Sequence, residues 1–173
     1  MLIPLTPPWH TQRERVRKAN SYLTAVRVEP AEADVIWLAN AAAEGDIDHA
    51  RWELRYARTA LAVLAAERDA LDDRTGSDVV AALGIVLAAD TRIETGMQAL
   101  AKRQFNDRLS AYREAFATRG GLVGSGERLG RVLLAFASDG ARSAGAPLPR
   151  AVELLATYAA EANDGTPTRA LAS

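Results

Sequence analysis

The chain has 173 residues, of which 49% are hydrophobic and 25% charged, and its net charge at neutral pH is −1. These values are typical of one folded domain and exclude a disordered chain or a strongly basic nucleic-acid binder. Because there is no cysteine, disulfides, thiolate metal sites and cysteine nucleophiles are also excluded.

Caps, prolines and glycines recur along an alanine-rich chain that lacks strand-like alternation, which predicts an all-α fold. We expect a single-domain bundle of six or seven helices over residues 1–162, followed by a flexible C-terminal tail over 163–173. The predicted helices cover about 8–27, 30–45, 47–72, 78–89, 91–118, 126–143 and 147–162.

Short polar and glycine signals set these boundaries. Gly45 is expected to stop the second helix, and Asp46 to cap the third. The sequence "TRIE" at 91–94 has the form of a capping box that opens the fifth helix. The glycines of "RGGLVGSGE" predict a loop, with Ser125 as the cap of the sixth helix.

The helix over about 47–72 is apolar on every side through "ALAVLAA", which predicts a central helix surrounded by the others. Leu54, Ala57, Leu61 and Leu64 form one apolar row at helical spacing. Arg68 continues that row, so we expect its guanidinium to face the core and to be paired with a carboxylate.

Charge is unevenly distributed along the chain. Residues 29–50 carry six acidic and no basic side chains, whereas 1–28 and 96–119 are mainly basic. The preferred interpretation places the acidic second helix against the basic first or fifth helix. The alternative leaves one basic face free for an acidic partner.

The C-terminal end of the central helix gathers four carboxylates that could bind Mg²⁺ or Mn²⁺. The candidate ligands are Glu67, Asp69, Asp72 and Asp73. Arg68 can instead neutralise Asp72 from one turn earlier, and an aspartate can cap the next turn. We therefore favour a structural role for this cluster and keep a metal-dependent hydrolase as an alternative.

Three arginines line one face at the start of the same helix, and they are candidates for binding an anion or a nucleic acid: Arg51, Arg55 and Arg58. Arg13 and Arg17 form a second row, with i, i+4 spacing, in the predicted first helix. The aromatic side chains expected for stacking on nucleic acid are sparse, so nucleic-acid binding is not the preferred interpretation. The two histidines are interpreted as surface or capping residues. No cofactor motif is present, and no cofactor is predicted.

These patterns favour a non-catalytic helical interaction or structural protein over an enzyme. No secretory signal or membrane-length apolar run is apparent, so we expect a cytoplasmic protein without a membrane partner. A fifth helix of about 25 residues would exceed the diameter of a small domain, which predicts a homodimer through the first and fifth helices. The candidate interface residues are Phe105, Leu109, Tyr112 and Phe116.

Overall fold

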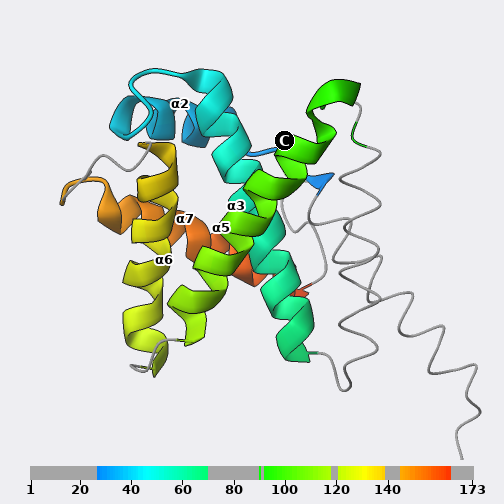
Figure 1. Ribbon diagram of the computed structural model, residues 1–173. Coiled ribbons are helices and arrows are strands. Elements are labelled where there is room, and N and C mark those ends of the chain that lie inside the picture. The colour runs from blue at the N-terminus through cyan, green and yellow to red at the C-terminus, as the bar shows by residue number, and fades with distance from the viewer. Residues whose placement is uncertain (1–26, 70–89, 91, 118–120, 139–144, 165–173) are drawn as a thin grey trace, which may run out of the picture.

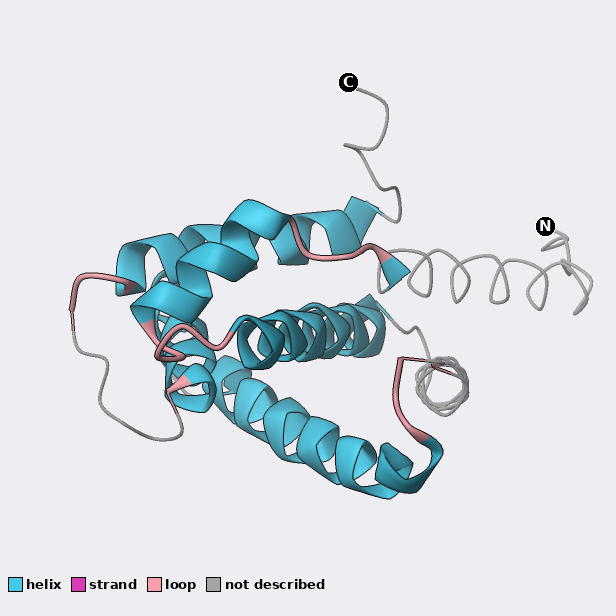
Figure 2. Cartoon of the chain, turned by 90° about the horizontal axis from the view of Figure 1, so that it is seen from above, coloured by secondary structure: helices cyan, strands magenta, loops and turns pink. Residues whose placement is uncertain are grey.

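The computed structural model describes residues 27–69, 90, 92–117, 121–138 and 145–164 (Figure 1). They form five α-helices and one 3-10 turn: α2 (Glu32–Ala41), α3 (Ile47–Asp69), η1 (Thr95–Met97), α5 (Gln98–Ala117), α6 (Gly121–Ala137) and α7 (Leu148–Asp164). No strand occurs in these ranges, as Figure 2 shows, and the all-α class is confirmed. The predicted helices over 8–27 and 78–89 fall almost wholly outside the described residues, as do residues 165–173 of the predicted tail.

Helix α3 lies against α2, α5, α6 and α7, and in Figure 1 it crosses α5 at the centre of the view. Four of its alanines are fully buried, and their small side chains leave room for neighbouring helices to approach: Ala50, Ala57, Ala60 and Ala62. The apolar row becomes only partly buried at Leu64, and Arg68 is exposed. The prediction that Arg68 faces the core is therefore wrong.

The turn between α2 and α3 follows the predicted signals with a shifted boundary. The α-helix of α2 ends at Ala41, four residues before the predicted stop at Gly45. Gly45 has φ +85°, a conformation that glycine adopts at little cost, and its N–H donates to the Ala39 carbonyl at 2.8 Å. The predicted cap is confirmed, since the Asp46 carboxylate accepts from the His49 backbone N–H at 2.9 Å.

Helix α6 begins at Gly121, so the predicted loop there is wrong and Ser125 lies buried inside the helix instead of capping it. Packing explains this difference. A Cβ atom on Gly130 would lie 3.0 Å from Leu148 Cδ1, and one on Gly126 would lie 3.2 Å from Val152 Cγ1. The two glycines therefore let α6 lie close to α7, which offsets their poor helix propensity.

The remaining boundaries differ by a few residues from those predicted. The 3-10 turn η1 precedes α5, whose α-helix starts at Gln98 and not at the proposed capping box. Helix α6 ends at Ala137, before the predicted 143, and α7 closely matches its predicted range. No described helix is both long and apolar enough to cross a membrane.

Candidate binding cleft between α3 and α5

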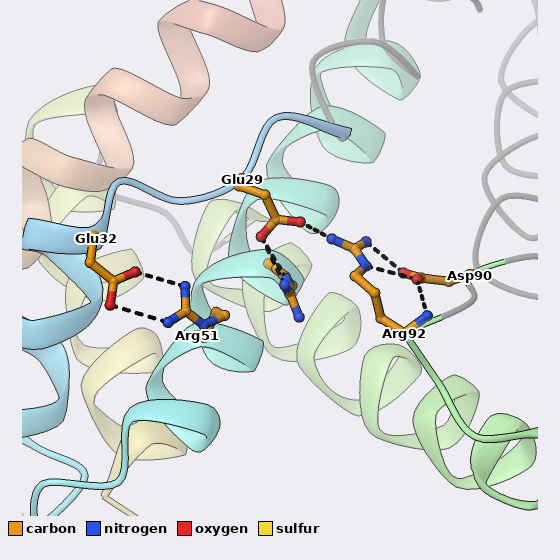
Figure 3. A network of polar contacts seen from close by, with 6 residues as sticks. Glu29, Glu32, Arg51, Asp90 and Arg92 are labelled. Atoms are coloured by element: carbon orange, nitrogen blue, oxygen red, sulfur yellow. Dashed lines mark hydrogen bonds and ion pairs between the residues drawn. The ribbon is translucent and has the colours of Figure 1, made fainter.

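The arginine row of α3 is used in ion pairs within the chain. Arg51 donates through two nitrogens to Glu32 at 2.9 and 3.2 Å (Figure 3). Arg55 and Arg58 pair with carboxylates at 2.8 and 2.7 Å, those of Glu29 and Glu161 respectively. These contacts hold α2 and α7 to α3, so the geometry favours a structural role for this row over the predicted anion site.

The acidic stretch that includes α2 also pairs with basic side chains, as expected, but with a different set. In addition to the α3 arginines, Asp34 lies 3.4 Å from Arg150 of α7. Glu29 contacts Arg92 in the segment before η1. Among the described residues, the acidic stretch thus pairs with α3, α7 and this segment, and no ion pair joins it to α5. The predicted first helix lies outside the described residues.

The carboxylates proposed as metal ligands are only partly described. Glu67 accepts from Arg113 Nη2 at 2.7 Å, an ion pair that joins α3 to α5. Asp69 is the last described residue of α3, and Asp72 and Asp73 fall outside the described ranges. Within those ranges no three His, Asp or Glu side chains converge as metal ligands. The metal site at Glu67–Asp73 stays a prediction.

Three of the four residues proposed for a dimer interface belong to the core of a single chain. Phe105, Leu109 and Tyr112 are 6%, 8% and 1% exposed, so they cannot form an exposed interface, and that part of the prediction is wrong. Phe116 is 39% exposed. The physical reason is the length of α5: its 20 residues span about 30 Å, so the helix fits the domain and packs against α3 and α6.

A cleft of about 430 Å³, which the sequence did not reveal, opens between α3, the segment 92–97 and the first turns of α5. Its lining combines aromatic, apolar and charged side chains: His49, Trp52, Glu53, Tyr56, Arg92, Ile93, Glu94, Met97, Leu100, Ala101, Gln104 and Arg108.

A largely enclosed ion pair forms part of this lining. Glu53 is 3% exposed and accepts from Arg108 Nε at 2.9 Å, and also from Arg108 Nη2. The guanidinium lies 4.5 Å from the ring centre of Phe136 and 5.1 Å from that of Tyr56. Burial works against its charge, but the hydrogen bonds and charge of Glu53 outweigh burial, so the pKa of Arg108 is raised.

Trp52 and Tyr56 form the aromatic wall, with ring centres 5.7 Å apart. The guanidinium of Arg55 lies 4.6 Å from the Trp52 ring centre, and that of Arg92 lies 6.0 Å from it. The Tyr56 hydroxyl donates to Gln104 Oε1 at 3.3 Å. Burial raises the pKa of Tyr56, so this hydroxyl stays protonated at neutral pH.

Arg92 connects the segment 92–97, which lines the cleft opposite the aromatic wall, to the rest of the domain. It donates to both carboxylate oxygens of Asp90, at 2.7 and 2.6 Å, and to Glu29 (Figure 3). Glu29 also accepts from Arg55, so one carboxylate joins this segment to α3. The hydrogen bonds from Arg92 hold the pKa of Asp90 below its usual value, although burial opposes them.

The rim of the cleft is apolar and exposed at Met97 (47%) and Leu100 (39%). Glu94 is exposed beside them, and its carboxylate has no hydrogen-bond or ion-pair partner among the described residues. At the other side, His49 Nε2 lies 3.1 Å from the Phe136 carbonyl oxygen, which favours the tautomer with a proton on Nε2.

Comparison with known proteins gave no match, whether by family model, by curated sequence or by solved structure. Function therefore has to be argued from the cleft itself. Tyr56 is held protonated, and Glu53 is paired with Arg108. Neither group is prepared to accept a proton from a substrate, as a general base must.

Proposed function

We propose that the chain is a non-catalytic helical binding protein that recognises a small molecule in the α3–α5 cleft. The observation that supports the proposal is an aromatic-walled cleft with an exposed apolar rim at Met97 and Leu100. Ligand sites commonly combine apolar walls with a few polar groups, and volumes of about 300–1,000 Å³ are usual. In this proposal α3 is the central helix, because it packs against four others and supplies one wall of the cleft.

The proposal requires that small molecules reach Trp52. In a Trp9→Phe/Trp37→Phe variant, the fluorescence of Trp52 reports on the cleft alone. Acrylamide, which is small and neutral, should quench this fluorescence efficiently. Ala101→Phe should reduce the quenching because Ala101 lines the cleft, whereas Ala99→Phe should not, because Ala99 is an exposed neighbour outside it. Fluorescence that resists acrylamide would refute the proposal.

A metal-dependent hydrolase using Glu67, Asp69, Asp72 and Asp73 is the competing function. The ion pair between Glu67 and Arg113 disfavours it, since a ligand carboxylate would have to leave its cation. Millimolar Mg²⁺ or Mn²⁺ should leave the melting temperature unchanged, because only a bound ion stabilises the folded state. An increase of several degrees that is lost in Asp69→Asn would favour the hydrolase.

A homodimer in the cytoplasm is proposed on narrower grounds, namely the exposed Phe116 and the absence of cysteine. Leu100 and Phe116 are exposed and lie 16 positions apart on α5, so they are about 160° apart around the helix and do not form one stripe. Light scattering should give about twice the chain mass of 18.5 kDa, and Phe116→Glu should give the monomer without unfolding it. A monomeric wild type would end this proposal.

A further inference from the structure

The charged groups that line the cleft are compensated by partners within the protein. Arg108 pairs with Glu53, and Arg92 pairs with Asp90 and Glu29. An anionic ligand would therefore meet guanidiniums that are already bound to carboxylates. A cationic ligand would find arginines already lying over the aromatic rings of Trp52 and Tyr56. Glu94 is the exception, but it lies exposed to water at the rim.

The surfaces that remain for a ligand are mainly apolar. Ile93, Met97, Leu100 and Ala101 contribute to the lining, and Met97 and Leu100 are the most exposed of the large apolar residues there. A stable protein interface covers roughly 800 Å² on each partner, far more than these side chains offer. A small molecule is therefore a better match for the cleft than the surface of another protein.

The side-chain amide of Gln104 is a polar group in the lining whose orientation is fixed by a hydrogen bond. The Tyr56 hydroxyl donates to the oxygen of the Gln104 side-chain amide at 3.3 Å, so the amide nitrogen points away from this hydrogen bond. The amide nitrogen of Gln104 has no hydrogen-bond partner among the described residues. Its N–H groups are thus available to an acceptor on the ligand, such as a carbonyl oxygen.

We infer that the α3–α5 cleft takes a neutral, mainly apolar small molecule that carries a hydrogen-bond acceptor, an inference that rests on the proposed function. The apolar body lies against Met97, Leu100 and Ala101, and the acceptor lies against the Gln104 amide. The ion pairs around the cleft exclude ligands with a net charge because desolvating a further charge there would not be compensated.

Three dyes of similar size and different charge test this inference on the full chain. Nile red is neutral with a carbonyl acceptor, anilinonaphthalene sulfonate is anionic, and thioflavin T is cationic. Nile red should bind one molecule per chain with enhanced fluorescence. Ala101→Phe should weaken binding at least about tenfold, and Ala99→Phe should leave it unchanged. Circular dichroism and unfolding curves confirm that both variants are folded. Gln104→Met should weaken binding several-fold in a variant that the same two measurements show to be folded.

The outcomes separate the inference from the proposed function. If a charged dye binds more tightly than Nile red and Ala101→Phe abolishes its binding, the cleft is a binding site but the neutral class is wrong. If Gln104→Met has no effect on Nile red binding, the inferred hydrogen bond between the ligand's acceptor and Gln104 is wrong. If Ala101→Phe and Ala99→Phe behave alike for all three dyes, or no dye binds, both the inference and the proposed function fail.

Discussion

Arg108 of α5 and Glu53 of α3 form an ion pair that is almost fully enclosed, with side-chain exposures of 11% and 3%. A buried charge that loses its partner remains desolvated without compensation. Glu53→Gln should therefore lower the free energy of unfolding by about 3 to 5 kcal/mol, as measured by denaturant titration.

Two controls accompany this prediction. The exposed pair Glu127–Arg131 should contribute at most about 1 kcal/mol, so Glu127→Gln should have little effect. The double variant Glu53→Leu/Arg108→Met, which removes both charges, should regain most of the lost stability. If Glu53→Gln is as mild as Glu127→Gln, the pair is hydrated in solution.

The approach of α6 to α7 predicts opposite effects of alanine at different glycines. Gly130→Ala should lower the free energy of unfolding by roughly 1 to 2 kcal/mol, because the new Cβ would lie 3.0 Å from Leu148 Cδ1 and 3.1 Å from Val152 Cγ2. At Gly96 nothing lies within 4 Å of the added Cβ, so Gly96→Ala should be neutral or stabilising. Thermal unfolding of both variants compares them directly.

Two buried tyrosines predict a loss of stability at alkaline pH. Burial raises the pKa of Tyr158 to about 12, although the nearby positive charge of Arg58 opposes the shift, and burial also raises the pKa of Tyr112. Tyrosine in the unfolded chain ionises near pH 10. Below that pH both states are protonated, and above it the unfolded state loses protons first. Stability is therefore complete below pH 10 and falls between pH 10 and 12.

Unfolding measured across this pH range in wild type and Tyr158→Phe checks the prediction. The Tyr158 hydroxyl is buried and has no hydrogen-bond partner among the described residues. Tyr158→Phe should therefore leave stability at pH 7 unchanged or increase it by about 1 kcal/mol. The variant should also lose less free energy of unfolding between pH 10 and 12 than the wild type. An identical alkaline decline in the two proteins would contradict the burial of this residue.

The link from Glu29 to Arg92 and Arg55 predicts that ionic strength affects the cleft. Arg92 and Glu29 are 41% and 48% exposed, so salt should screen their attraction. Glu29→Gln should change stability by less than about 1 kcal/mol, yet weaken Nile red binding and remove its dependence on salt. Equal salt dependence in wild type and variant would show that the link does not control the cleft.

Local signals in the sequence predicted much of the helix pattern. Asp46 was recognisable as a cap because a polar acceptor next to an apolar helix has few other roles, and α7 was recognisable from its proline start and apolar periodicity. Gly126 and Gly130 misled the prediction because their role depends on Leu148 and Val152 of another helix. Glycine spacing alone does not reveal which helix lies opposite.

The cleft was missed although part of its signal was present. Glu53 shares a helix face with Tyr56, Ala57 and Ala60, and all three are buried. A carboxylate within such an apolar row indicates a buried cation nearby, and Arg108 lies in a similar row of α5. Sequence alone could not pair them, because the relative position of α3 and α5 is set by packing between the helices.

Helix α7 comes last among the described helices, yet it packs against α3 and supplies the carboxylate that pairs with Arg58. Glu161 lies 103 residues after Arg58. A ribosome adds about 5 to 20 residues per second, so Glu161 is synthesised roughly 5 to 20 s after Arg58. The face of α3 that packs against α7 stays uncovered during that interval. During that time the apolar face of α3 that α7 later covers is exposed in the newly made chain and can bind chaperones. Slow translation should therefore lower the yield of folded protein, whereas a chaperone that shields α3 should restore it.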